Sequence, residues 1–198
     1  MKNYQLNYRL AIIFIISFSC LYTLKATHIP PDAGAVNVTD YGATGDGVTD
    51  DTEAIKQAID DNWAFYGGHP NNFRFLYFPD GTYVVSDQIY WKRWLVFQGE
   101  SESGTIIKLK DNAEGFGDPG SPKAVLRCHY NNNMSFSNYI QDLTVNTGSG
   151  NPGAIGVSYG QHNMGAMRNV TITSETGSII GLDLSETVTV AMWLYGGA

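Results

Sequence analysis

The strongest candidates for contact with a substrate are three consecutive polar residues, Gln161, His162 and Asn163. The imidazole of His162 titrates near neutral pH, so it could serve as an acid or a base. An Asn side chain at a turn can also bond to neighbouring backbone groups, so a structural role stays open for Asn163. No carboxylate partner for His162 is identifiable, and the sequence therefore assigns no catalytic residue.

A second cluster with chemical potential is formed by Asp46, Asp50 and Asp51. Calcium binds several carboxylate oxygens, so the cluster could be a metal site. It lacks the Asp-x-Asp-x-Asp-Gly register and the distal Glu of an EF-hand loop. A polar turn followed by a capped helix accounts for all three residues, and we therefore expect no metal ion there.

A thiol and several aromatic rings are the remaining candidates. Cys128 is the one cysteine that clearly lies outside the N-terminal segment; it could be a nucleophile, but burial as a small apolar residue is the commoner role. Aromatic rings can stack on sugars when exposed and join the core when buried. Burial is the expected outcome for most of the four rings considered, Trp91, Trp94, Tyr130 and Tyr159.

The elements that must position these residues repeat in the last third of the chain. Residues 140–146 align with residues 167–173, and residues 154–159 align with residues 179–184, in the same order and at nearly the same spacing. Such a period in strand-and-turn sequence predicts a solenoid whose rungs stack as parallel sheets. A β-sandwich is the alternative, but few two-residue hairpin turns are visible. The inward stacking pairs would be Leu143 with Val170, Val145 with Ile172, Ile155 with Ile180 and Val157 with Leu182.

Residues 50–63 carry the only convincing helical pattern after the N-terminal segment. Apolar residues recur at helical spacing at positions 54, 55, 58 and 59. Asp50 can cap the helix, with Glu53 three positions later as the partner of a capping box. A helix that is polar on one side and apolar on the other is suited to cover the open end of the first rung.

Four segments together resemble a known family. They are residues 36–59 (VNVTDYGATGDGVTDDTEAIKQAI), residues 78–84 (FPDGTYV) leading to Gln98 and Gly99, residues 150–156 (GNPGAIG) and residues 163–170 (NMGAMRNV). They are similar to the opening of the pectin-lyase-like right-handed β-helix proteins, in the form shared by polygalacturonases, rhamnogalacturonase/epimerase-like pectate-lyase domains and β-helical β-1,3-glucanases. The resemblance implies an all-β fold. Residues 27–198 would be the N-terminal rungs of a single-stranded right-handed parallel β-helix with an N-terminal capping α-helix.

The resemblance also implies a polysaccharide partner and a carbohydrate-active protein. Glycoside hydrolysis of a pectin or β-glucan is preferred over lyase chemistry, because the opening motif looks closest to the hydrolase-like branch. Two alternatives stay open, a polysaccharide lyase and a non-catalytic polysaccharide-binding or adhesion module on the same fold. No cofactor is expected, apart from calcium in the case of a lyase.

The residues that would catalyse hydrolysis are not evident. The reaction usually needs two carboxyl groups that flank the glycosidic bond. In polygalacturonase-like relatives they lie in Asn-Thr-Asp, paired-Asp and His-Gly motifs followed by Arg-Ile-Lys, and this chain has none of these in that arrangement. We therefore expect the catalytic rungs to be largely missing here and the chain alone to be inactive.

Net charge excludes one class of partner. The chain has 198 residues and a formal charge of −7, and residues 1–26 hold three bases and no acid. Without that segment the charge is −10. Because an acidic surface repels a phosphate backbone, nucleic acid is not an expected partner.

The N-terminus is interpreted as a secretory signal. Lys2 and Arg9 precede an apolar run at residues 10–24, which is shorter than the roughly 20 residues of a spanning helix. Cleavage after Ala26 would define a signal peptide of residues 1–26. Processing at Cys20 is the alternative, and it would add a lipid anchor as the only membrane contact. The expected location is secreted or periplasmic, or lipid-anchored at the cell surface.

At the other end, residues 191–198 carry no charge and no capping helix. A parallel solenoid that ended there would present an open rung, and such edges recruit other chains. We therefore expect the β-helix to be truncated at this end.

The signal interpretation predicts that the exported protein starts near Thr27 or at a lipid-modified Cys20, because the leader is removed during export. Intact-mass measurement of the exported protein, with mapping of its N-terminal peptide, tests this. Recovery of the intact 198-residue chain from the cytoplasm would contradict it.

Overall fold

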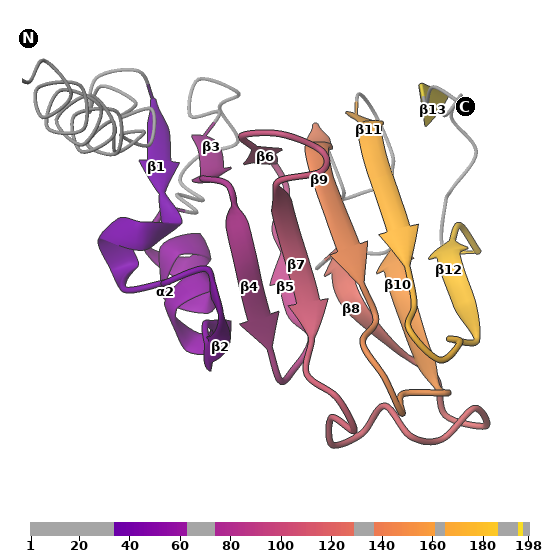
Figure 1. Ribbon diagram of the computed structural model, residues 1–198. Helices are drawn as coiled ribbons and strands as arrows, with labels where there is room; N and C mark the ends of the chain where they lie inside the picture. The colour runs from indigo at the N-terminus through magenta and orange to yellow at the C-terminus, as the bar shows by residue number, and fades with distance from the viewer. Residues whose placement is uncertain (1–33, 63–73, 129–136, 161–164, 186–193, 196–198) are drawn as a thin grey trace, which may run out of the picture.

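The computed structural model describes residues 34–62, 74–128, 137–160, 165–185 and 194–195, and in these ranges the chain is mostly β-structure (Figure 1). Two helices lie near the start, η1 (Val38–Tyr41), a 3-10 helix, and α2 (Thr52–Asn62). Every strand pair is parallel. Parallel pairing throughout is expected of a solenoid in which each strand lies beside its equivalent in the next rung.

The strands form three faces. The β3–β6 face consists of β1 (Ala35–Asn37), β3 (Arg74–Phe78), β6 (Leu95–Gly99), the first halves of β9 (Asn138–Asn146) and β11 (Gly165–Thr173), and β13 (Leu194–Tyr195). The β4–β7 face consists of β2 (Asp46–Asp50), β4 (Gly81–Val85), β7 (Thr105–Leu109) and the second halves of β9 and β11. The β8–β10 face consists of β5 (Ile89–Trp91), β8 (Lys123–Cys128), β10 (Ala154–Ser158) and β12 (Ile180–Asp183). The chain visits the three faces in turn, which confirms the predicted right-handed parallel β-helix.

β9 and β11 each turn a corner in mid-strand and so belong to two faces. Residues 139–141 pair with β6, whereas residues 144–146 pair with β7. Between them Asp142 has a φ of 56°, and Asn169, opposite it in β11, has a φ of 50°. Asp and Asn tolerate this left-handed backbone better than most residues. Asn169 Nδ2 donates to Asp142 Oδ1 over 2.8 Å, so the two corners are tied together.

Aromatic rings run through the core from rung to rung. Phe78 lies 5.4 Å from Phe97 between ring centroids, and Phe97 lies 5.5 Å from Trp91. Trp91 in turn lies 5.4 Å from Tyr159. All four side chains are fully buried. Such pairs stabilise the fold beyond the area they bury, so they join successive rungs into one core.

The stacking predicted from the repeat is confirmed in its register. Leu143 lies opposite Val170, Val145 opposite Ile172, Ile155 opposite Ile180 and Val157 opposite Leu182.

The burial predicted for Ile155 is confirmed, since this side chain is 7% exposed, whereas the inward orientation predicted for its register partner Ile180 is wrong. Ile180 is 38% exposed. β12 is the last strand of the four-stranded sheet, so one side of Ile180 has no neighbouring strand among the described residues.

The predicted capping helix is confirmed as α2. It follows β2 as β5 follows β4, and it packs against β5 (Figure 1). In the first rung it therefore takes the place that a strand holds on the β8–β10 face of later rungs. Its apolar residues Ile55, Ala58 and Ile59 are buried.

The start of α2 differs in detail from the prediction. The helix begins at Thr52, and the carbonyl of Asp51 accepts a hydrogen bond from the Ile55 amide. Asp50 does accept a hydrogen bond from the Thr52 amide, over 3.0 Å. Glu53 accepts one from Lys56 rather than closing a capping box. The side chain of Asp51 instead turns back to the preceding loop.

The acidic cluster is used for turns and for the helix start. Asp51 is 1% exposed, and its carboxylate accepts hydrogen bonds from the amides of Thr44 (2.7 Å) and Gly45 (3.1 Å). Asp46 accepts hydrogen bonds from the amides of Thr49 and Val48, which lower the pKa of Asp46 to about 2. These hydrogen bonds give each carboxylate a structural role, as the sequence indicated.

Three further expectations concern Cys128, membrane-spanning helices and the N-terminal leader. Cys128 is buried, and its Sγ accepts a hydrogen bond from Asn138 Nδ2 over 3.4 Å, as expected of a core residue. No helix within the described ranges is long and apolar enough to cross a bilayer. The leader at residues 1–26, with Cys20, lies outside the described residues.

Gly99 tests the close stacking of rungs. A Cβ at this position would lie 2.0 Å from the carbonyl oxygen of Asp142 in the next rung. We expect Gly99→Ala to lower the free energy of unfolding by about 2 kcal/mol, because a backbone atom must move to make room. Urea denaturation followed by circular dichroism measures the change. Gly117→Ala is the control, since a Cβ there meets no atom within 4 Å, and equal stability of the two variants would contradict the stacking.

Candidate functional site

The predicted contact residues Gln161, His162 and Asn163 lie outside the described residues. In the sequence they follow β10 after only Tyr159 and Gly160. β10 belongs to the β8–β10 face, so this face is the described part of the molecule that directly precedes them in the sequence.

One row of side chains crosses the outer side of this face in register. Tyr90 of β5 pairs with Arg127 of β8, Arg127 with Ser158 of β10, and Ser158 with Asp183 of β12. We call these four residues the outer row. The residues that flank them in each strand, such as Trp91 and Val157, are buried in the core. Because neighbouring residues of a strand point to opposite sides, the outer row faces away from the core.

The outer row combines an aromatic ring with polar groups that hold one another. Tyr90 is 44% exposed. Ser158 Oγ lies 3.4 Å from Asp183 Oδ2, and the Ser185 amide donates to Asp183 Oδ1 over 2.9 Å. Burial tends to raise the pKa of Asp183, but hydrogen bonds from Ser185 and Ser158 and the charge of Arg127 lower it below its ordinary value. Asp183 therefore stays ionised and can accept hydrogen bonds from hydroxyl groups.

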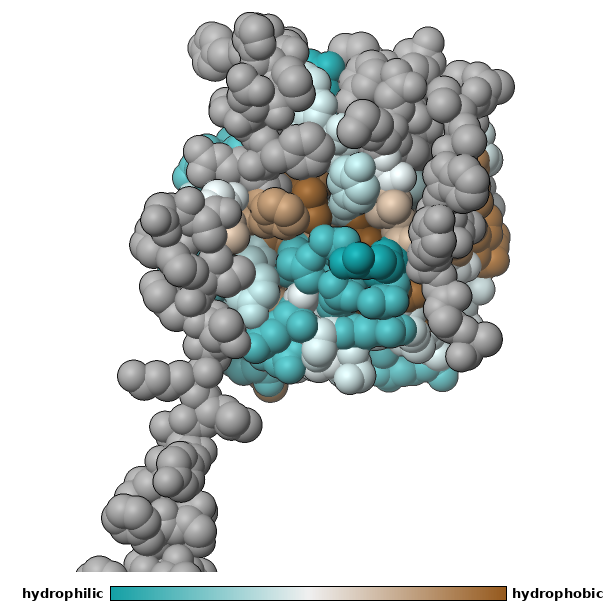
Figure 2. Space-filling view, turned by 90° about the horizontal axis from the view of Figure 1, so that it is seen from above, coloured by the Kyte–Doolittle hydropathy of each residue, from teal (hydrophilic) through white to brown (hydrophobic). Residues whose placement is uncertain are grey.

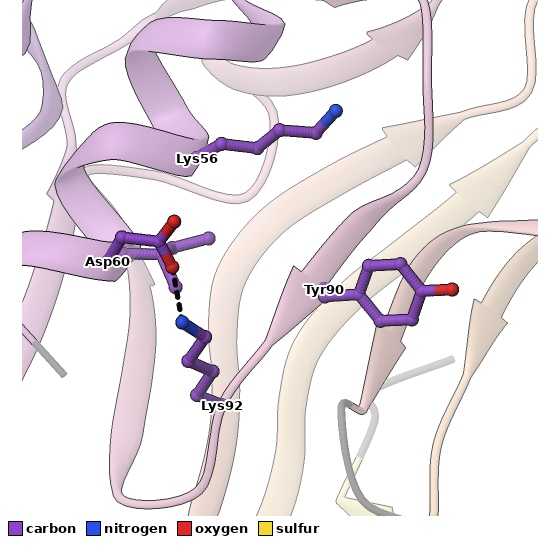
Figure 3. Close-up of a pocket in the computed structure, with 5 residues that line it drawn as sticks. Lys56, Asp60, Tyr90 and Lys92 are labelled. Atoms are coloured by element: carbon purple, nitrogen blue, oxygen red, sulfur yellow. Dashed lines mark hydrogen bonds and ion pairs between the residues drawn. The ribbon is translucent and has the colours of Figure 1, made fainter. Parts of the chain in front are cut away.

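A hollow of about 270 Å³ adjoins the start of the outer row. Its described lining residues come from α2 and from β5 and its end: Lys56, Ile59, Asp60, Tyr90 and Lys92. Figure 3 shows the ion pair between Lys92 and Asp60 beside the helix, with the Tyr90 ring extending away from it. The capping helix therefore forms one wall of the hollow.

Asp87 connects the wall of this hollow to the next rung. Its carboxylate accepts hydrogen bonds from Lys56 Nζ of α2 (3.0 Å) and Lys123 Nζ of β8 (2.6 Å). Burial tends to raise the pKa of Asp87, but Lys123, the Gln88 amide and Lys56 together lower it to about 2. Lys123 also lies 4.7 Å from the centroid of the Phe116 ring.

Basic residues are concentrated here relative to the rest of an acidic chain. Leaving out the three of residues 1–26, the chain has nine Lys and Arg residues. Four of them, Lys56, Lys92, Lys123 and Arg127, belong to the hollow, its Asp87 link or the outer row. Carboxylates pair with the three lysines, so this face offers both donors and acceptors of charge-assisted hydrogen bonds.

A second hollow, of about 360 Å³, lies on the β4–β7 face. Lys108 lines it and bonds to Glu175 over 2.6 Å, which raises the pKa of Lys108. No aromatic residue is among its described lining residues, which are Gly47, Val48, Asp50, Val84, Lys108, Lys110 and Asp111. The β8–β10 face is therefore the better candidate for a ligand that carries apolar as well as polar groups.

The aromatic residues show what the sequence could and could not reveal. Trp91 and Tyr159 are fully buried, as expected, and Trp94 is partly exposed under the guanidinium of Arg93. Tyr130 lies outside the described residues. Tyr90 was missed, although its place between the apolar residues Ile89 and Trp91 is the alternating pattern of a strand with one solvent-facing side chain.

A family model matches residues 35–192; its description is rhamnogalacturonase A/epimerase, pectate lyase-like. The match covers nearly all of the described residues.

Curated relatives match shorter stretches. Plasmin and fibronectin-binding protein A of Streptococcus pneumoniae is 45% identical over 58 residues, which is 29% of this chain and 7% of that protein. A probable glucan endo-1,3-beta-glucosidase of Arthroderma benhamiae is 38% identical over 82 residues, which is 40% of this chain and 9% of that protein. Mannuronan C5-epimerase AlgE3 of Azotobacter vinelandii is 36% identical over 90 residues, 42% of this chain and 5% of that protein. This chain thus spans less than a tenth of the length of these relatives.

Two solved structures share the fold. ORF18 of Geobacillus virus E2 superposes with a TM-score of 0.54 at 27% identity, over 81% of this chain and 28% of that chain. The A-module of mannuronan C-5 epimerase AlgE4 from Azotobacter vinelandii superposes with a TM-score of 0.51 at 24% identity, over 74% of this chain and 41% of that chain.

The link through Asp87 gives a pH-dependent prediction. The folded state favours ionised Asp87, because its pKa lies at about 2 instead of 3.8. Its stabilisation is therefore present above about pH 4 and is lost as the pH falls through about 2. We expect Asp87→Asn to unfold at lower urea concentration than the wild type at pH 7, and the gap to close toward pH 2.

Urea titrations at several pH values measure this gap. Glu114→Gln, at an exposed position, is the control that should match the wild type throughout. A gap that stayed constant between pH 7 and pH 2 would show that Asp87 does not act through its charge.

Proposed function

This chain belongs to the rhamnogalacturonase A/epimerase, pectate lyase-like family, and we propose that it is part of an exported carbohydrate-active protein that binds a polysaccharide along the β8–β10 face. The basic start and short apolar run of residues 1–26 support export. The exposed ring of Tyr90, with Arg127 and Asp183 partly exposed in the same row, supports the place of binding.

The observation that carries this proposal is the in-register row that begins at Tyr90. An exposed aromatic ring offers a flat apolar surface for the C–H face of a sugar. Arg127 and Asp183 in the same row offer a donor and an ionised acceptor for its hydroxyl groups. Successive rungs lie about 4.8 Å apart. A polymer that runs along the solenoid would therefore pass Tyr90, Arg127 and Asp183, with the buried Ser158 between the last two.

The relatives support a polysaccharide as the ligand. Their names state that one is a glucan endo-1,3-beta-glucosidase and another a mannuronan C5-epimerase. The mixed charges of the β8–β10 face suit a neutral glucan or a uronic acid polymer, since both donors and acceptors are present.

Glycoside hydrolysis is the reaction that we propose for this carbohydrate-active protein. Asp87 and Asp183 both have a lowered pKa, which suits a base or a hydroxyl acceptor. The acid that protonates the leaving group must instead hold its proton. His162, which follows Ser158 by four residues in the sequence, is a candidate for that proton transfer.

A non-catalytic adhesion module is the second candidate. One observation favours it: the two carboxylates with lowered pKa on this face are held by structural hydrogen bonds or ion pairs. One relative is named for binding plasmin and fibronectin, which supports a binding role. Binding of a polysaccharide without release of reducing ends would favour this candidate over the hydrolase.

Tyr90 tests the proposed binding face. We expect Tyr90→Ala to weaken polysaccharide binding about tenfold, the loss of ~1.4 kcal/mol for one stacking ring. Tyr90→Phe should bind almost as the wild type does, because the ring is kept. Affinity electrophoresis in gels that contain β-1,3-glucan, alginate or polygalacturonate measures the effect.

Val48→Ala is the matched control, because Val48 is an apolar residue 84% exposed on the β4–β7 face. It should leave binding unchanged. If all the variants migrate like the wild type in a gel that retards the wild type, the polysaccharide binds elsewhere.

A further inference from the structure

The β3–β6 face carries two outward rows that the proposed binding site does not use. One row runs from Phe75 through Val96 and Tyr139 to Ala166, in register. The next runs from Tyr77 through Gln98 and Gln141 to Arg168. The residues between them in the strands, Leu76, Phe97, Ile140 and Met167, belong to the core. Both rows therefore lie on the outer side of the strands, on a different sheet from the outer row, and within them Val96 and Tyr77 are buried at 2% and 5% exposure.

In the row that begins at Tyr77, the side chains of Gln98 and Gln141 are fixed by hydrogen bonds. Gln141 Nε2 donates to Gln98 Oε1 over 2.5 Å, and Gln98 Nε2 donates to Asp142 Oδ2 over 2.9 Å. Arg168 lies 3.7 Å from the same carboxylate and stays 56% exposed in its side chain. The two amides are thus held in one orientation without a ligand. Less side-chain conformational entropy would therefore be lost on binding.

Hydrogen-bonding capacity is left over at this surface. Gln141 Oε1 has no donor among the described residues, and the exposed guanidinium of Arg168 has donors beyond its single ion pair. Together they present an acceptor and several donors in neighbouring rungs.

An exposed aromatic ring lies on the same face as these amides. Phe75 is 38% exposed, and its register partner in β6 is Val96, which lies two residues before Gln98. Seen from above, hydrophilic side chains gather in one area with hydrophobic ones next to them (Figure 2). We call Phe75, Gln98, Gln141 and Arg168 the amide strip.

We propose that the amide strip is a second polysaccharide-binding surface, separate from the β8–β10 face. It would take a linear chain along the solenoid axis, with a sugar face on Phe75 and hydroxyl or carboxylate groups on Gln141 and Arg168. The inference rests on the proposed function, because it assigns the same class of ligand to another side of the molecule.

A polymer fits the strip better than a protein partner does. A protein interface has a core that is apolar and densely packed. Here the exposed apolar surface is limited, and polar side chains occupy one register position in three successive rungs, about 4.8 Å apart: Gln98, Gln141 and Arg168. A repeating polar ladder beside an aromatic ring matches a ligand that itself repeats hydroxyl groups on a similar length scale. Two surfaces on one molecule would also raise the affinity for long chains over short ones.

The test compares the two surfaces in the full chain. Phe75→Ala and Gln141→Ala are each expected to weaken binding to long β-1,3-glucan, alginate or polygalacturonate severalfold in affinity electrophoresis. The combination of Phe75→Ala with Tyr90→Ala should lose more than either alone, because the two residues lie on separate faces. Phe75→Tyr keeps the ring and should bind about as tightly as the wild type does. Thermal unfolding by circular dichroism checks that each variant is folded.

The outcomes separate this inference from the proposed function. If Tyr90→Ala weakens binding while Phe75→Ala and Gln141→Ala have no effect, the amide strip is not a binding surface and the β8–β10 site stands. If the strip variants weaken binding and Tyr90→Ala does not, the strip stands and the β8–β10 site fails. If the wild type binds none of the three polysaccharides, both proposals fail.

Discussion

Hydrogen bonding between the backbones of successive rungs is the constraint on which the rest of this structure depends. Parallel strands can pair only if equivalent residues lie side by side, about 4.8 Å apart. The same register then decides which side chains stack inside and which line up outside. Core pairs such as Val145 with Ile172 and the outer row that begins at Tyr90 follow from this one rule. The outer surfaces of a solenoid are therefore rows of side chains in register. Such rows suit a polymeric ligand whose units also repeat.

Among the described residues no rung precedes the one formed by β1 and β2, and α2 covers the end of the core there. Its buried apolar residues cover the open end of the core, and the carboxylate of Asp51 holds the loop at Thr44 against the helix start. Because α2 takes the place of a strand on the β8–β10 face, it also becomes one wall of the hollow beside Tyr90. The helix that caps the first rung therefore also forms part of the candidate site.

The sequence predicted the parts that depend on local pattern. The repeat gave the rung register of the last third, and helical spacing gave the cap. It could not predict which strands pair between rungs of unequal length. Val96 and Tyr139, for example, are register partners although they are 43 residues apart in the sequence. Nor could it predict that Ile180 is 38% exposed although its register partner Ile155 is buried. Tyr90 was missed for a related reason, because a lone Tyr in a short strand becomes meaningful only when Arg127 and Ser158 are known to lie beside it.

The central claim is that a polysaccharide lies along the β8–β10 face. Chemical-shift mapping of the isotope-labelled protein during titration with an oligosaccharide of a bound polymer tests it most directly. The account predicts that the largest amide shifts fall at Tyr90, Arg127, Ser158 and Asp183, with none at Val48 on the β4–β7 face. Shifts confined to the β4–β7 face, with the outer row unchanged at saturation, would contradict it.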